Sequence, residues 1–136
     1  MLPKCFVIPK QISTFAPTKQ IIMGELSFEL VLLIECQTFI ESLPKAVGDK
    51  IFYNIHRVQQ GERNAELFKK LEGTEIWEFR TLYNKVKYRL FAFWDTETDT
   101  MVIATHGIIK KTKKTPQSVI EKAERIRQEY FKDKIE

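Results

Sequence analysis

The chain has 136 residues, a formal net charge of +4 and 43% hydrophobic residues, which is typical of one globular domain with a buried core. Five glycines and five prolines are too few for a collagenous or low-complexity chain, and no apolar stretch reaches the roughly 20 residues of a membrane span. Two cysteines exclude a disulfide framework, and no cysteine–histidine spacing indicates a zinc site. We therefore expect a soluble, cytoplasmic protein with no metal, no cofactor and no membrane partner.

The charges are distributed unevenly along the chain. Residues 23–79 carry six basic and ten acidic side chains, whereas residues 80–136 carry thirteen basic and eight acidic ones. This asymmetry predicts two electrostatic faces, of which the basic one suits a polyanion such as a nucleic acid.

The N-terminal segment differs in character from the rest. Residues 1–22 contain three prolines, three lysines and no acidic residue, and they show no hydrophobic period, so we expect a poorly ordered tail followed by a folded domain over residues 23–136. Met23 directly precedes the first strand pattern, and we expect it to be the natural start. The intact mass of the natively expressed protein tests this, because a mass that includes residue 1 would contradict it.

The first half of the domain reads as one strand and two helices. Alternating apolar residues predict a strand over Leu26–Ile34, with a short helix over Gln37–Leu43 after it. A second helix over Lys45–Gln60 ends at Gly61 and carries one apolar stripe, formed by Val47, Ile51, Ile55 and Val58. Asn64–Gly73 is expected to be a short helical turn and loop.

The second half reads as three strands and a helix. The strands are predicted over Glu75–Tyr83, Val86–Trp94 and Met101–Ile108, and the connections between them are short enough for hairpins. A final helix begins with Thr115 as N-cap and Pro116 at the first turn, and ends near Lys132. The order β-α-α-β-β-β-α predicts an α+β fold with a small antiparallel sheet of about four strands, two N-terminal helices and a C-terminal helix.

Two arginines are expected to face each other in this sheet. If the first hairpin closes symmetrically around Asn84-Lys85, Arg80 lies directly opposite Arg89, and like charges in that position destabilise a strand pair. Either Glu78 neutralises the two arginines, or they line a cleft for a phosphate, whose oxygens suit the planar guanidinium.

Basic and aromatic residues are interleaved around this pair. Four of the five residues 110–114 are lysines; such a run is either a solvated loop or, next to the arginine strand, a phosphate contact. Most of the aromatic residues are expected in the core, with Tyr83 and Tyr88 at the surface near the hairpin tip, where they can stack on bases. The candidate RNA-binding residues are Tyr83, Lys87, Tyr88, Lys113 and Lys114.

No established catalytic motif is present. The sequence contains no serine–histidine–acid motif, glycine-rich phosphate loop or paired-carboxylate signature. His106, on the last strand, is either a general base near neutral pH or a structural histidine. An enzyme with this sequence is therefore expected to work without metal.

Six short motifs follow one another in a characteristic order between Leu26 and Phe131. They are Glu66-Leu67-Phe68-Lys69-Lys70-Leu71, Ile76-Trp77-Glu78-Phe79-Arg80, Tyr88-Arg89-Leu90, His106-Gly107, Lys110-Lys111-Thr112-Lys113-Lys114-Thr115-Pro116 and Ala123-Glu124-Arg125. This set resembles the phage-derived Gp49-like, HigB-type branch of the RelE/ParE toxin superfamily. The resemblance implies a type II toxin–antitoxin toxin that cuts mRNA on the ribosome as an endoribonuclease (mRNA interferase) and so inhibits translation. It also implies a cognate antitoxin, usually a helix-turn-helix protein that represses the operon.

The resemblance also implies roles for individual residues. Arg89 corresponds to the arginine that contacts the scissile phosphate, Arg80 to a second motif arginine, and Lys110 and Lys111 to the basic pair at the end of the last strand. The base that takes the 2′ proton is then His106 or a lysine of lowered pKa. Some RelE-type members have a tyrosine where this chain has residues 117–119, which leaves the acid and base unassigned. A ParE-like gyrase inhibitor and an inactive member acting as operon regulator are the alternatives.

Overall fold

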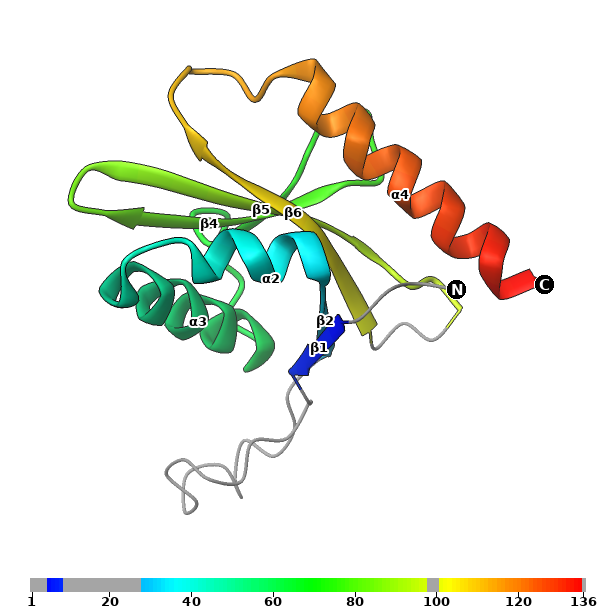
Figure 1. Cartoon of the computed structure of the whole chain (residues 1–136), viewed down its shortest axis with the longest axis horizontal. Coiled ribbons are helices and arrows are strands. Elements are labelled where there is room, and N and C mark those ends of the chain that lie inside the picture. Colours follow the sequence, from blue (N-terminus) through cyan, green and yellow to red (C-terminus); the bar gives the residue numbers. More distant parts are fainter. Residues whose placement is uncertain (1–4, 9–27, 98–100, 136) are drawn as a thin grey trace, which may run out of the picture.

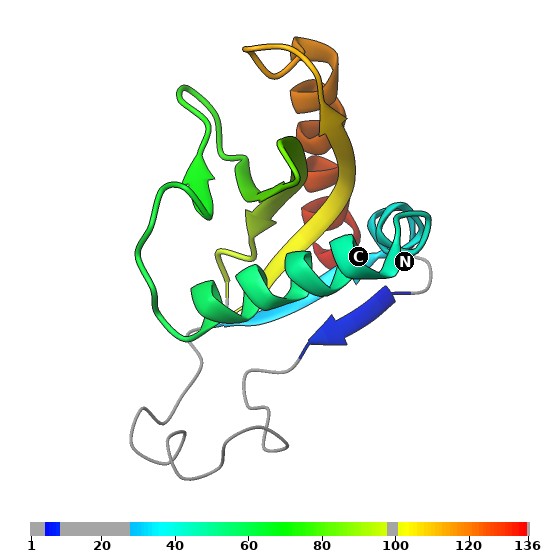
Figure 2. The same cartoon turned by 90° about the vertical axis from the view of Figure 1, so that its left-hand side faces the viewer.

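The computed structural model describes residues 5–8, 28–97 and 101–135. The elements in chain order are β1 (Cys5–Ile8), β2 (Glu29–Leu33), α2 (Ile34–Glu41), α3 (Lys45–Gln59), β3 (Phe68–Lys70), β4 (Trp77–Tyr83), β5 (Val86–Trp94), β6 (Met101–Lys110) and α4 (Gln117–Ile135). The strands form one sheet, with α2 and α3 on one face and α4 on the other (Figures 1 and 2). The expected α+β class is confirmed.

The sheet is larger than the expected sheet of about four strands, and it is mixed. Its order is β1-β2-β6-β5-β4-β3, and β2 pairs with β6 in parallel while the other pairs are antiparallel. No hairpin joins β2 to β6, so no turn in the sequence signals their pairing. Because β2 lies between two strands and under helices on both faces, it is a continuous apolar run, Leu30–Leu33.

Each face of the sheet buries its own hydrophobic core. The predicted stripe of α3 lies in one core, and its four residues are each at most 5% exposed. On the opposite face α4 contributes Ala123 and Tyr130, which pack with Phe91, Phe93 and Ile103. The apolar stripe predicted for α3 is therefore confirmed.

Three local expectations differ from the structure. The chain forms strand β3 within the segment where a helical turn and loop were expected, because Phe68 pairs with Phe79 and stacks on its ring at 4.4 Å between centroids. Helix α2 begins three residues earlier than predicted and leaves Ile34 exposed. Thr115 does not cap α4 with its hydroxyl, which instead donates to Glu78 at 3.5 Å.

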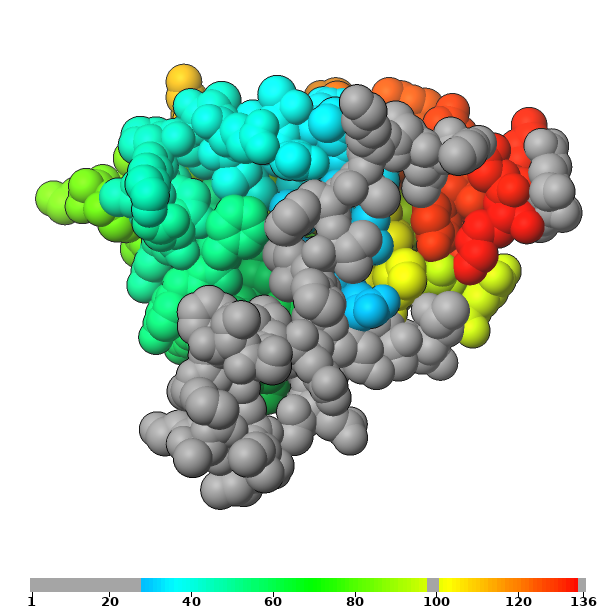
Figure 3. Space-filling model, turned by 60° about the horizontal axis from the view of Figure 1, so that its bottom comes forward, coloured from blue at the N-terminus to red at the C-terminus, as the bar shows by residue number. Residues whose placement is uncertain are grey.

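The hairpin of β4 and β5 has the register that the sequence predicted. Asn84 and Lys85 both have positive φ, at 49° and 68°, as the tight primed turns of hairpins require. Tyr83 pairs with Val86, and Arg80 pairs with Arg89. The tip of this hairpin projects beyond α3 (Figures 1 and 3).

Part of the expected N-terminal tail is described. Residues 5–8 form β1, which pairs antiparallel with β2, whereas the rest of residues 1–22, and the expected start at residue 23, lie outside the described residues. Among the helices that the structure describes, none combines the length and the apolar character needed to cross a membrane.

Gly107 is required by a close contact between α2 and β6. A Cβ at this position would lie 2.4 and 2.6 Å from two carbons of the Phe39 ring and 2.8 Å from Leu90 Cδ2. We expect Gly107→Ala to lower the free energy of unfolding by about 1–3 kcal/mol through overpacking, measured by urea denaturation.

The matched control is Gly48→Ala in α3. A Cβ there would meet Ile40 Cγ2 at 3.6 Å and the Ile40 carbonyl oxygen at 4.0 Å, which are ordinary contacts, so alanine should stabilise the helix by about 0.5–1 kcal/mol. If Gly107→Ala were as stable as the parent, the close contact would not matter to folding.

Candidate functional site

A β-bulge in β6 determines which side chains share a face with the arginine pair. Phe91 pairs with His106, but its neighbour Ala92 pairs with Ala104, so Thr105 is an extra residue in β6. The Thr105 hydroxyl donates to the Phe91 carbonyl at 3.2 Å. Without the bulge, strict alternation would place Lys110 on the α2 face of the sheet; with it, Lys110 lies on the face of Arg89.

A single buried carboxylate lies between the two arginines. Glu78 Oε1 is 3.1 Å from Arg80 Nε and 3.4 Å from Arg89 Nε. Glu78 is 2% exposed and Arg89 5% exposed, whereas Arg80 is only half-buried. Both alternatives raised by the sequence therefore meet here, because the single carboxylate offsets only one of the two positive charges.

The two guanidinium groups are held by backbone carbonyls as well as by Glu78. Arg80 Nη1 donates to the Ala65 carbonyl at 3.0 Å, and Arg89 Nη1 donates to the Tyr88 carbonyl at 3.1 Å. Both Nε atoms are buried and make no hydrogen bond within the described part of the chain. Each Nε nevertheless faces Glu78 Oε1 at ion-pair distance, so the shared carboxylate is the counter-charge of both guanidinium groups.

Lys110 completes the cluster from the neighbouring strand. It pairs with Lys87 in the β5–β6 register. Burial lowers the pKa of Lys110, and the charges of Arg89, Arg80 and Lys87 lower it further against the opposing effect of Glu78. Four cations thus act with one carboxylate, which makes this part of the sheet strongly electropositive.

The cluster opens into a cleft of about 590 Å³. Its lining includes Arg80, Lys110 and Lys113 from the residues predicted by sequence, with Arg89 buried beneath. It also includes six residues to which sequence reasoning gave no site role: Lys69, Lys70, Leu71, Glu72, Gly73 and Thr115. Lys69 and Lys70 were not predicted as site residues because the segment before Leu71 was expected to be a loop, and a loop gives no sign of pairing with β4.

His106 lies away from the cleft. It is 4% exposed, its ring is 5.3 Å from that of Phe91, and its Nδ1 is 2.8 Å from the Thr105 hydroxyl. Burial, followed by the charge of Lys122, lowers its pKa to about 4. Four strand residues, about 13 Å, separate it from Lys110 along β6, so the structure does not bring these two candidate bases together.

The remaining candidates are scattered around the β4–β5 hairpin and the lysine-rich residues 110–114, which we call the lysine loop. Tyr88 was expected at the surface, but it is 8% exposed and packs in the core under α3, because alternation from the core residue Leu90 turns it inward. Tyr83 is half-buried at the edge of the same core. Three lysines are exposed but do not line the cleft: Lys87, Lys111 and Lys114.

No group of three or more histidine, cysteine, aspartate or glutamate side chains that could hold a metal ion occurs among residues 28–97 and 101–135.

Comparison with known proteins assigns the chain to a family. Residues 38–128, which include the hairpin, the bulge and the lysine loop, match the family model described as Phage derived protein Gp49-like (DUF891). The chain belongs to this family. Gp49-like proteins are RelE/ParE-like toxins of toxin–antitoxin systems, which implies a cognate antitoxin. No curated protein matches the chain.

The contact of Glu78 with both arginines predicts that removing its charge lowers the stability of the folded protein. Glu78→Gln keeps the size of the side chain but leaves Arg80 and Arg89 without their shared carboxylate, and we expect it to lower the free energy of unfolding by about 3–5 kcal/mol. Millimolar phosphate should restore part of this loss, because the anion replaces the carboxylate. Urea denaturation with and without phosphate measures both effects.

The matched control is Glu75→Gln, three residues away. Glu75 is exposed and lies 3.9 Å from Lys70, so its substitution should change stability by less than about 0.5 kcal/mol. Equal stability losses in the two variants, or no response to phosphate in Glu78→Gln, would contradict the conclusion that the Glu78 carboxylate offsets the charges of Arg80 and Arg89.

Proposed function

We propose that this protein is a metal-independent, ribosome-dependent mRNA endoribonuclease of the HigB type, and that the cleft around Arg80, Arg89 and Lys110 binds the scissile phosphate. The observation that carries the proposal is the net positive charge of the cluster, in which Arg80, Arg89 and Lys110 share the single buried carboxylate of Glu78. The Gp49-like family membership supports a toxin, and the cleft supplies the reason to choose RNA.

The geometry suits cleavage by the RNA's own 2′-hydroxyl. In that reaction the 2′ oxygen loses its proton to a base and attacks the adjacent phosphorus, and the bond to the 5′ oxygen breaks. The departing 5′ oxygen takes a proton from water, so that a cyclic phosphate and a 5′-hydroxyl end form. Negative charge on the phosphate oxygens grows in the transition state, and fixed cations stabilise it most where water is excluded. Arg80 reaches the phosphate from the wall of the cleft, while buried Arg89 strengthens the field beneath it.

Lys110 is better placed than His106 to take the 2′ proton. Its amine lines the cleft, and its pKa lies below the ordinary lysine value because of burial and neighbouring cations, so more of it is neutral near physiological pH. His106, with a pKa of about 4 and a buried ring, is a weak base beyond the reach of the cleft. We therefore assign the base to Lys110 and a structural role to His106.

The decisive experiment is induction of the toxin in a bacterial host that lacks the antitoxin, with new mRNA 5′ ends mapped over the first minutes. We expect cuts in phase with codons, bearing 5′-hydroxyl ends, in translated messages. Arg89→Ala and Lys110→Ala should abolish them, because the first removes a cation from the phosphate site and the second removes the proposed base.

The control is Lys132→Ala, which removes an exposed lysine near the end of α4 and should cut like the parent. Because buried Arg89 also contributes to folding, Lys110→Ala provides the independent surface variant. Growth arrest with intact mRNA would refute the ribonuclease and favour a gyrase-type toxin, and absence of arrest would indicate an inactive member.

The assignment of the base predicts a pH dependence. Below the lowered pKa of Lys110 the cleavage rate should rise with pH, because the fraction of neutral amine rises. Lys110→Arg keeps the positive charge but cannot lose its proton, so single-turnover cleavage on ribosomes should fall about 100-fold and lose this pH dependence. Lys111→Arg, at the exposed neighbour, is the control; a Lys110→Arg enzyme with the parental profile would exclude Lys110 as the base.

A further inference from the structure

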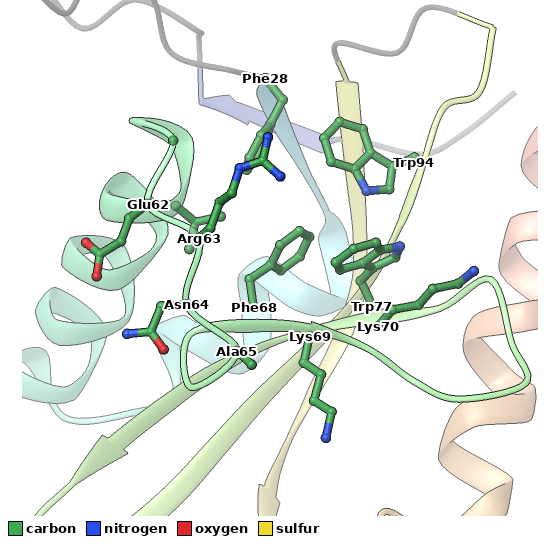
Figure 4. A pocket seen from close by; sticks show the side chains of 12 residues that line it. Phe28, Glu62, Arg63, Asn64, Ala65, Phe68, Lys69, Lys70, Trp77 and Trp94 are labelled. Atoms are coloured by element: carbon green, nitrogen blue, oxygen red, sulfur yellow. The ribbon is translucent and has the colours of Figure 1, made fainter.

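A second hollow, of about 560 Å³, lies on the other face of the sheet at the β3 edge (Figure 4). It is open to solvent between the end of α3, the following loop, the residue before β2, and strands β3, β4 and β5. Its lining residues are Phe28, Val58, Gly61, Glu62, Arg63, Asn64, Ala65, Phe68, Lys69, Lys70, Trp77 and Trp94. None of the candidate residues from the sequence lies in it. We refer to it as the aromatic pocket.

Flat rings dominate the aromatic pocket. The Phe68 ring stacks on Trp77 with 4.7 Å between centroids and 22° between planes. Trp94 meets Phe28 edge-on at 5.3 Å. Phe68, Trp77 and Trp94 are only half-buried, so part of each is available to another flat group.

Cations lie around the rings. Arg63 is exposed and its side chain extends toward the hollow, whereas the Glu62 carboxylate points away from it (Figure 4). Within the described ranges, no residue pairs with the Arg63 guanidinium. Lys69 is likewise exposed and unpaired within those ranges. Lys70 approaches Glu75 at 3.9 Å. The rim is therefore mainly positive.

The aromatic pocket adjoins the cation cleft across one short strand. Lys69 and Lys70 line both hollows. In the β3–β4 register Lys69 pairs with Glu78, whose side chain lies in the cleft, and Lys70 pairs with Trp77, whose ring lies in the aromatic pocket. Since β3 is three residues long and lies at the edge of the sheet, a flexible strand of nucleic acid can pass around it from one hollow to the other.

We propose that the aromatic pocket binds a nucleobase of the same single-stranded RNA whose phosphate occupies the cleft. The inference rests on the proposed function and adds a base subsite to it. Aromatic rings stack on bases of any sequence, and cations beside them hold the backbone. An apolar side chain of a protein partner would also enter the hollow, but it would leave Arg63 without a counter-charge, whereas a nucleotide supplies both the ring and the phosphate.

The tryptophans provide a direct readout. The chain has two of them, Trp77 and Trp94, and both line the aromatic pocket. The purified full chain is titrated at low salt with a 2′-O-methyl tetranucleotide, which cannot be cleaved because its 2′ oxygen is blocked. We expect saturable quenching of tryptophan fluorescence. An abasic oligonucleotide of the same length should bind without quenching.

Matched variants separate stacking from charge. Trp77→Phe keeps a flat ring and should bind within about twofold of the parent, whereas Trp77→Leu, still reported by Trp94, should bind about tenfold more weakly. Arg63→Ala should weaken binding, and Arg125→Ala, an exposed arginine on α4, should leave it unchanged. Circular dichroism confirms that each variant is folded.

The outcomes distinguish this inference from the ribonuclease proposal. If quenching is absent, or if Trp77→Leu binds like Trp77→Phe, the base subsite is overturned even where mRNA is cut in cells. Unchanged oligonucleotide binding with lost antitoxin binding in Trp77→Leu would assign the aromatic pocket to the protein partner instead. Ring-dependent quenching in a chain that cuts no mRNA would keep the base subsite and refute only the nuclease.

Discussion

Because side chains alternate along a strand, the register of the β4–β5 hairpin determines both the core and the cleft. Phe79 pairs with Leu90 on the α3 face, and Arg80 pairs with Arg89 on the opposite face. A slip of one residue would turn core side chains into solvent and arginines into the core. The burial of Phe79 and Leu90 therefore holds the two arginines together despite their repulsion, and the buried Glu78 carboxylate makes that arrangement tolerable.

The sequence was informative where the structure depends on local signals. The stripe of α3, the Asn84-Lys85 turn and the opposition of Arg80 and Arg89 all follow from spacing within about 15 residues, and the structure confirms them. Pairings between distant segments carry no such signal. The parallel β2–β6 pair and strand β3 form because tertiary contacts, such as Phe68 on Phe79, override weak local preferences.

The bulge at Thr105 shows why the site was harder to predict than the fold. A strand read with strict alternation gives no sign of one additional residue, yet that residue determines the face of every side chain after it. It brings Lys110 beside Arg89 and places His106 on the same face under α4, where the ring is buried. The same bulge leaves Gly107 facing α2, where the Phe39 ring occupies the space of a side chain. The adjacent His106-Gly107 pair therefore has two separate structural explanations.

Strand β3 connects the two hollows physically, and this has a consequence for how they work together. Arg80 donates its backbone N–H to the Leu67 carbonyl at 2.7 Å and its Nη1 to the Ala65 carbonyl, so the segment that carries Phe68 into the aromatic pocket also positions the cleft arginine. A base that packs against Phe68 and Trp77 would hold this edge segment in place and with it the Arg80 guanidinium. Binding energy from a base remote from the scissile bond would then be used to orient the phosphate contact, which is how enzymes convert substrate affinity into rate.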